Sequence, residues 1–129
     1  MRVLFVEDDP MNRRVVRDML SVAGVDMSEA ESAEIGLRSV EEGAFDLILM
    51  DLRMPGMDGL TAIKHIRART DDKAKLPIIV VTADAALNLR EECLAGGATD
   101  FLTKPVAMDR LFDSIGRMIA SGECEATLD

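Results

Sequence analysis

The sequence has few of the residues that build disulfide frameworks, zinc sites or membrane spans. Only two cysteines are present, Cys93 and Cys124, and their spacing is unlike that of paired metal ligands, so neither a structural disulfide nor a zinc site is expected. The apolar runs are far shorter than the roughly 20 residues of a membrane-spanning helix, and no signal-type run follows Met1. We therefore expect a cytoplasmic protein that does not associate with a membrane.

Basic residues are also scarce. The chain has 15 Lys and Arg against 24 Asp and Glu, which gives a formal net charge of -9. Phosphate groups are bound mainly through Lys and Arg, so direct binding to DNA, RNA or an anionic lipid surface is not expected. The acidic excess suits a divalent cation or a basic partner surface, although solubility alone accounts equally well for most of these carboxylates.

Four continuous apolar runs recur along the chain, at residues 3–6, 47–50, 78–81 and 101–102. Continuous runs without alternation are typical of strands that are buried on both faces of a parallel sheet. Residues 25–30 alternate between apolar and polar, which predicts a strand at a sheet edge. Helical periodicity separates these segments, so the pattern predicts five βα units in one doubly wound α/β domain.

The domain is expected to cover residues 1–119, and the chain length leaves no room for a second one. Residues 120–129 lose the helical periodicity and become small, polar and acidic, which indicates a short frayed tail. Ser32 and Asp109 stand where two helices should begin and are candidate N-caps.

Polar residues follow the apolar runs at the point where each predicted strand ends. They are Glu7, Asp8, Asp9, Asp51, Thr82 and Lys104. Because the carboxyl ends of parallel strands meet at one sheet edge, we expect these side chains to share a pocket. Clustered carboxylates need a neutralising cation, and hard oxygen ligands fit Mg²⁺. A carboxylate there could attack phosphorus, with the metal, a hydroxyl and an ammonium stabilising the phosphoryl oxygens.

Four separated segments resemble the response-regulator receiver family. They are VEDD at residues 6–9, LMDLRMPGMDG at 49–59, VTA at 81–83 and KP at 104–105. The agreement extends over about residues 1–119, with each segment at the end of a predicted strand. The resemblance implies a flavodoxin-like (βα)5 fold with a five-stranded parallel sheet of order 2-1-3-4-5. It also implies a phospho-switch, not an enzyme, whose only chemistry is its own phosphorylation and the hydrolysis of that phosphate.

The resemblance assigns the metal site residue by residue. Asp51 would be the phosphoacceptor, and Asp8 and Asp51 would bind Mg²⁺ directly. Glu7 would act mostly through water, and the backbone carbonyl of Arg53 would complete the site.

The remaining roles follow from the same resemblance. Thr82 would donate to a phosphoryl oxygen, and Lys104 would bridge to Asp51 and then to the phosphate. The Lys104–Pro105 bond is expected to be cis, as it often is in this family. Phe101 matches the aromatic switch position, where Tyr is common, and a static core ring is the alternative for it.

The implied partners are proteins. A sensor histidine kinase or a histidine phosphotransfer protein would supply the phosphoryl group. An unknown downstream protein would read a surface formed by a helix at 84–95, the fifth strand and a helix at 107–119. Its candidate contacts are Arg90, Glu91, Arg110 and Arg117.

Three other functions are weighed against this one. Phosphatases of the haloacid dehalogenase type also use an aspartate after a buried strand, but they need a second acid two residues later, where Arg53 stands. A P-loop phosphotransferase is disfavoured because no glycine-rich loop ends in Gly-Lys-Ser/Thr. An interaction module that keeps the fold without the chemistry is disfavoured because Asp51, Thr82 and Lys104 are all present.

Two further expectations concern charged or titratable side chains. The only histidine, His65, stands between residues that occupy the buried face of their helix, so it should be exposed and chemically inert. Arg53 and Asp84 each stand two residues beyond a site residue. We hypothesise that they pair across the pocket mouth and limit access of water to the phosphoryl group, with two independent surface charges as the alternative.

Overall fold

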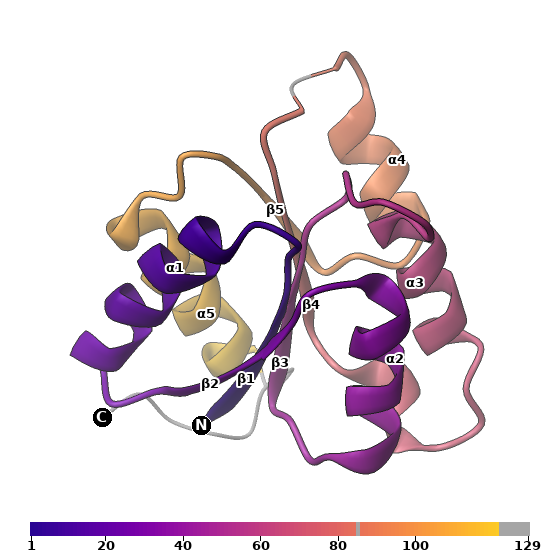
Figure 1. Ribbon diagram of the computed structural model, residues 1–129, viewed down its shortest axis with the longest axis horizontal. Coiled ribbons are helices and arrows are strands. Elements are labelled where there is room, and N and C mark those ends of the chain that lie inside the picture. Colours follow the sequence, from indigo (N-terminus) through magenta and orange to yellow (C-terminus); the bar gives the residue numbers. More distant parts are fainter. Residues whose placement is uncertain (85, 122–129) are drawn as a thin grey trace.

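The computed structural model describes residues 1–84 and 86–121, in which strands and helices alternate along the chain (Figure 1). The strands are β1 (Arg2–Val6), β2 (Asp26–Ala30), β3 (Leu47–Met50), β4 (Ile78–Thr82) and β5 (Asp100–Thr103). The α-helices are α1 (Pro10–Val22), α2 (Ala33–Glu42), α3 (Gly59–Arg67), α4 (Leu89–Ala95) and α5 (Met108–Ala120), and a 3-10 helix, η1 (Asp72–Lys75), precedes β4.

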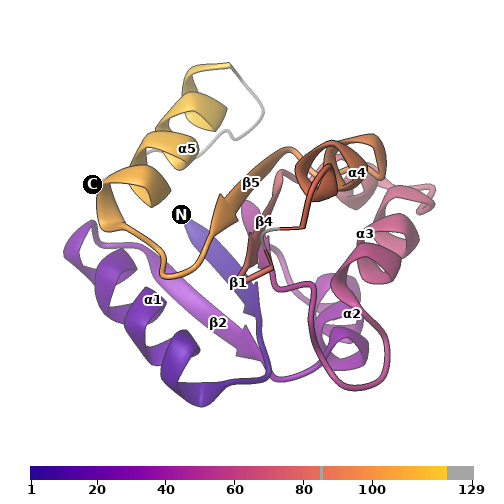
Figure 2. The same ribbon diagram turned by 90° about the horizontal axis from the view of Figure 1, so that it is seen from above.

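All five strands are parallel, and the sheet order is β2-β1-β3-β4-β5. The predicted doubly wound fold and its strand order are therefore confirmed. Seen from above, α1 and α5 lie on one face of the sheet, and α2, α3 and α4 lie on the other (Figure 2).

The central strands contain continuous apolar runs at residues 3–6, 47–50 and 78–81 because each strand contributes to two cores. On β1, Leu4 and Val6 face the core under α2, α3 and α4, whereas Val3 and Phe5 face the core under α1 and α5. The edge strand β2 is only partly covered, and Asp26 is exposed on it. Its alternating sequence is therefore explained by its edge position.

The helix starts confirm one prediction and correct two. Ser32 is the N-cap of α2, where its side chain accepts from the backbone of Ile35. Asp109 is not a cap, since α5 begins at Met108 and Asp109 lies inside its first turn. The helix expected at 84–95 begins only at Leu89, because Asn88 before it has a positive φ of 65° that a helix cannot contain.

The described part of α5 continues to Ala120, and the rest of the predicted tail, 122–129, lies outside the described residues. Among the described helices, none combines the length and the apolar character needed to cross a membrane.

Candidate functional site

The carboxyl ends of four neighbouring strands place polar side chains at one edge of the sheet. Glu7 and Asp8 follow β1, Asp51 follows β3, and Thr82 ends β4. The strand register pairs Val6 with Met50 and Met50 with Val80, so the residues after these positions leave the sheet side by side. Lys104 follows β5, and its backbone N–H donates to the carbonyl of Thr82 at 2.8 Å.

Three carboxylates converge at this edge. Oxygen atoms of Glu7, Asp8 and Asp51 all lie within 4.8 Å of one another. Glu7 and Asp51 are almost fully buried, with exposed fractions of 1% and 3%, whereas Asp8 is exposed. Partial desolvation and the adjacent Glu7 carboxylate raise the pKa of Asp8 above its ordinary value. Mutual repulsion of this kind is what a bound cation would relieve.

The donor set fits Mg²⁺. This ion takes oxygen ligands at about 2 Å, so opposite ligands of one ion are roughly 4 Å apart, and the three carboxylates need only small adjustments to share it. The exposed Asp8 leaves one side of the cluster open for water or a phosphate oxygen. The carbonyl of Arg53 belongs to the loop after β3, and its part in the metal site stays a prediction.

Lys104 supplies the positive charge of the site. Its Nζ donates to Glu7 Oε1 and lies 3.5 Å from Asp51 Oδ2. Burial works against the charge of the ammonium, but the hydrogen bond to Glu7 and the charge of Asp51 outweigh it and raise the pKa of Lys104. Lys104 is therefore protonated at neutral pH. The peptide bond to Pro105 is cis, as the resemblance implied.

Thr82 and Phe101 occupy neighbouring strands. Thr82 is fully buried, and its Oγ1 accepts from the backbone N–H of Asp84 at 3.2 Å. Phe101 pairs with Val80 in the register of β4 and β5, and its ring packs in the core under α2, α3 and α4 with 9% of its surface exposed. The ring is thus part of the core.

Arg53 and Asp84 form an ion pair between the loops that follow β3 and β4. Arg53 Nε donates to Asp84 Oδ2 at 2.9 Å, and Nη2 donates to the same oxygen. This hydrogen bond is the largest cause of the lowered pKa of Asp84. The predicted pairing is confirmed, although the Arg53 side chain is largely exposed.

The structure separates one candidate, Asp9, from the site and confirms that His65 lies outside it. Asp9 is not among the clustered carboxylates: it is the N-cap of α1, where its side chain accepts from the backbone N–H of Met11 at 2.9 Å. His65 is exposed on α3, as expected.

Two contacting residues were missed by the sequence reasoning. Asn12 in the first turn of α1 donates from Nδ2 to Glu7 Oε1 at 3.2 Å. Gly59, the first residue of α3, packs so closely that a Cβ there would lie 2.1 Å from the carbonyl oxygen of Asp51. Both lie in the first turn of a helix that follows a strand, and that topological position is the signal that could have identified them.

Comparison with known proteins identifies the family. The family described as the response regulator receiver domain matches residues 3–116. The sensor protein GacS of Pseudomonas syringae pv. syringae is 39% identical over 112 residues, which are 85% of this chain and 12% of that protein. The transcriptional regulatory protein ZraR of Salmonella typhimurium is 34% identical over 118 residues, 92% of this chain and 26% of that protein. The chain thus spans only a small part of these relatives.

Solved structures agree with this match. The receiver domain of a sensor histidine kinase from Pseudomonas aeruginosa PAO1, with a magnesium ion coordinated in its active site cleft, superposes with a TM-score of 0.83 at 37% identity. The match covers 92% of this chain and 97% of that one. A response regulator from Chloroflexus aurantiacus gives a TM-score of 0.86 at 28% identity, with the same coverage of both chains. With its sheet order, its acid cluster and a family match over nearly the whole described chain, this protein belongs to the response-regulator receiver domain family.

Proposed function

We propose that this receiver domain is a phosphoacceptor switch of a two-component or phosphorelay system. The observation that carries the proposal is the buried Asp51 carboxylate, with two further carboxylates within 4.8 Å and the ammonium of Lys104 at 3.5 Å. A carboxylate in this setting has a cation on one side and space for a metal on the other. Both would stabilise a phosphoryl group as it is transferred.

The donor we propose is the phosphohistidine of a sensor histidine kinase or of a histidine phosphotransfer protein. An oxygen of Asp51 forms the new bond to phosphorus, the bond from phosphorus to the imidazole nitrogen breaks, and the imidazole leaves after taking up a proton. Several relatives are named as sensor histidine kinases, which supports a donor of this class. The downstream partner we propose is a further protein, which would read the surface described below.

Glu7, Asp8 and Asp51 would hold Mg²⁺, with the carbonyl of Arg53 as a further ligand. When bound, the ion supplies Lewis-acid stabilisation of the phosphoryl oxygens. Asp8 is the exposed member and is proposed as a direct ligand together with Asp51. Glu7 is proposed to act mostly through water, because its Oε1 already accepts from Lys104 and Asn12.

The chain's own residues would complete the reaction. Lys104 would turn from Glu7 towards the phosphoryl group, which offers its ammonium a more highly charged acceptor. Thr82 would donate its hydroxyl proton to a phosphoryl oxygen, since among the described residues its Oγ1 accepts from Asp84 and its proton is not seen to be donated. Its movement and the packing of Phe101 would carry the change to β5.

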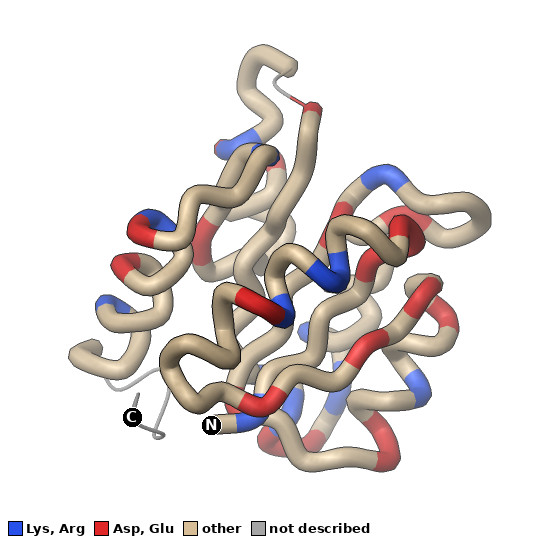
Figure 3. The backbone as a smooth tube through the Cα atoms, turned by 60° about the vertical axis from the view of Figure 1, so that its left-hand side comes forward, with Lys and Arg blue, Asp and Glu red and all other residues tan. Residues whose placement is uncertain are grey.

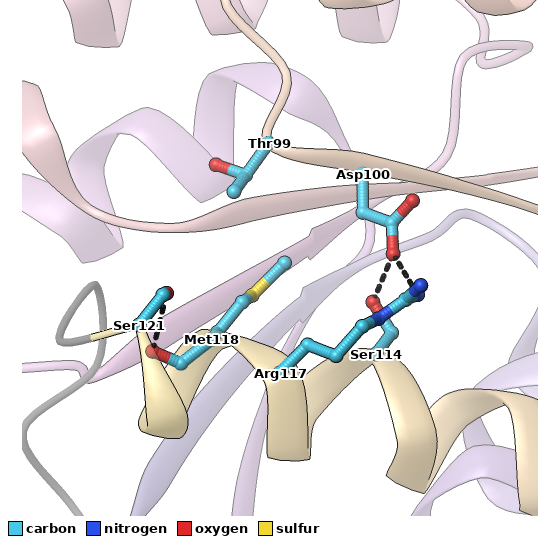
Figure 4. A pocket seen from close by; sticks show the side chains of 6 residues that line it. All are labelled: Thr99, Asp100, Ser114, Arg117, Met118 and Ser121. Carbon is cyan, nitrogen blue, oxygen red and sulfur yellow. Dashed lines mark hydrogen bonds and ion pairs between the residues drawn. The ribbon is translucent and has the colours of Figure 1, made fainter.

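The proposed output surface is formed by α4, β5 and α5, and one carboxylate joins all three. Asp100 on β5 accepts from Ser114 Oγ and from Arg117 Nη2 at 2.9 Å, both on α5 (Figure 4). The same side chain lies 3.8 Å from Arg90 Nη2 on α4. A shift of β5 would therefore change the contacts of Asp100 with both α4 and α5. In the view of Figure 3, acidic and basic positions are interspersed along the backbone.

Two of the predicted partner contacts, Arg90 and Arg117, are thus engaged within the molecule. Arg90 also lines a groove of about 450 Å³ with Arg110 and Phe101, next to the exposed Glu91. A partner that binds this groove would contact Phe101 directly.

A phosphatase reaction on separate substrates is not supported by the site. The residue two positions after the nucleophile is Arg53, whose guanidinium is paired with Asp84 and cannot act as a general acid. We propose that the protein is not an enzyme acting on other molecules, and that its catalysis is limited to its own phosphorylation and dephosphorylation.

Mass spectrometry after incubation with Mg²⁺ and acetyl phosphate tests the proposal. We expect the wild type to gain one phosphoryl group and Asp51→Asn to gain none, because an amide is a poor nucleophile and a poor metal ligand. The matched control is Asp18→Asn, which changes an exposed acid on α1 and should behave as the wild type. Equal phosphate incorporation in Asp51→Asn would rule out the assignment.

A further inference from the structure

Asn12 contacts the acid cluster but has no part in the reaction proposed above. Its Nδ2 donates to Glu7 Oε1 at 3.2 Å. The same oxygen accepts from Lys104 Nζ, and Glu7 Oε2 accepts from the backbone N–H of Asp9 at 3.3 Å. Glu7 is only 1% exposed, so water can hardly replace a hydrogen-bond donor that its carboxylate loses. Glu7 Oε1 is therefore held by two donors, one charged and one neutral.

These two donors differ in what else they can bind. Lys104 Nζ already lies 3.5 Å from Asp51 Oδ2, so a phosphoryl group on Asp51 would compete for its ammonium. Asn12 has a short side chain on the first turn of α1 and would remain beside Glu7. We propose that Asn12 is a positioning residue that keeps the Glu7 carboxylate in place when Lys104 turns to the phosphoryl group, an inference that rests on the proposed function.

The surroundings of Asn12 make its role hard to replace. It lines a small cavity of about 130 Å³ between α1 and the segment after β5. The other described lining residues are apolar except Lys104, so no third side chain there can donate to Glu7. Removing the amide by truncation would enlarge this cavity and could admit a water molecule in its place. Leucine, which branches at the same carbon and carries no donor, is therefore the sharper substitution.

The test compares two affinities of Asn12→Leu, using Mg²⁺ alone and then beryllofluoride, a phosphoryl mimic, at saturating Mg²⁺. With Mg²⁺ alone Lys104 still donates to Glu7, and we expect the affinity to fall less than about threefold. With beryllofluoride bound, Lys104 would donate to the mimic instead of to Glu7. We then expect the affinity for beryllofluoride to fall about tenfold, the size typical when a partner of a metal ligand is removed. The metal-free Tm should match that of the wild type, because without a phosphoryl mimic Lys104 still donates to Glu7 Oε1 and leucine fills the volume of the amide.

Met11→Ala is the control, because it changes the neighbouring exposed side chain on the same turn. Wild-type protein that binds neither Mg²⁺ nor beryllofluoride would overturn the proposed function itself. Wild-type binding together with unchanged beryllofluoride affinity in Asn12→Leu would overturn only the role of Asn12. Equal losses of both affinities, or a lowered metal-free Tm, would indicate a general structural role and would also contradict the inference.

Discussion

Gly59 shows how closely a single residue constrains the phosphoacceptor. A Cβ at this position would lie 2.1 Å from the carbonyl oxygen of Asp51, and backbone atoms cannot yield as a flexible side chain can. The backbone N–H of Gly59 also donates to the carbonyl of Leu52 at 3.1 Å. The absence of a side chain therefore lets α3 begin directly against the loop that carries Asp51.

We predict that Gly59→Ala lowers the free energy of unfolding by about 3 kcal/mol, the upper range for overpacking a buried site. Urea unfolding measures this change. Gly116→Ala is the control, because a Cβ on this α5 residue meets no atom within 4 Å. That variant should gain up to about 1 kcal/mol from helix propensity. Two variants of equal stability would show that the close approach at Gly59 is relieved at little cost.

Asp58 caps the same helix and gives a pH-dependent prediction. Its side chain accepts from the backbone N–H of Thr61 at 2.8 Å, and this hydrogen bond is the main cause of its lowered pKa. A carboxyl group whose folded-state pKa is lowered stabilises the fold above its unfolded pKa and loses that contribution as the pH falls.

We predict that Asp58→Ala costs about 1 kcal/mol at neutral pH, the usual value of an N-cap. The difference from the wild type should shrink as the pH falls through the lowered pKa of Asp58. Thermal unfolding across that range measures it, with Asp18→Ala as a surface control. A difference that stays constant down to acid pH would mean that the carboxylate is not the stabilising group.

At the scale of elements, the loops after β3 and β4 are joined by the pair of Arg53 and Asp84. Each partner stands two residues beyond Asp51 or Thr82 in the chain, and our hypothesis is that the pair limits the entry of water that would hydrolyse an acyl phosphate on Asp51. If the pair limits that entry, breaking it from either side should remove the same barrier. If the charges act independently, their effects should add.

We predict that Arg53→Ala and Asp84→Ala each speed dephosphorylation by about threefold, which corresponds to the ~0.7 kcal/mol expected of an exposed ion pair. The double variant should be no faster than either single one. Rates are measured by loss of phosphate from the phosphorylated chain. Additive effects in the double variant would indicate two separate surface charges.

At the scale of the whole molecule, phosphorylation of Asp51 would have to change the surface formed by α4, β5 and α5. Phe101 is buried in the core under α2, α3 and α4, so the proposed switch would have to change the rotamer of its ring and not only its burial. In the proposed switch the Thr82 hydroxyl, which accepts from the backbone N–H of Asp84, would turn to donate to the phosphoryl group. The contacts of Asp100 with α4 and α5 would then pass the change outward.

We predict that beryllofluoride with Mg²⁺ moves Thr82, changes the rotamer of Phe101, and shifts the amide signals of α4, β5 and α5 more than those of α2. A structure of the complex and its amide spectra measure this. The control is Asp51→Asn under the same conditions, which should show none of these shifts. An unmoved Thr82 and an unmoved ring would exclude this route and leave Phe101 as a static core residue.

The sequence by itself determined the architecture and most of the site. Continuous apolar runs that alternate with helical periodicity are typical of strands covered on both faces, as in a parallel sheet with helices on each side. Parallel strands then place Glu7, Asp8, Asp51 and Thr82 at one edge, whatever the details of packing. The positions of the strands could be predicted because each apolar run marks its own buried segment, independently of the rest of the chain.

The tertiary structure decided the contacts that depend on exact distance. Lys104 and Glu7 are 97 residues apart, and only the packing of β5 beyond β4 brings the ammonium to that carboxylate. Asp9 does not belong to the acid cluster because its side chain caps the N-terminus of α1. Asn12 contacts the site because the first turn of α1 places its amide within hydrogen-bond distance of Glu7. Such choices depend on helix rotation and side-chain reach, which residue type and spacing do not specify.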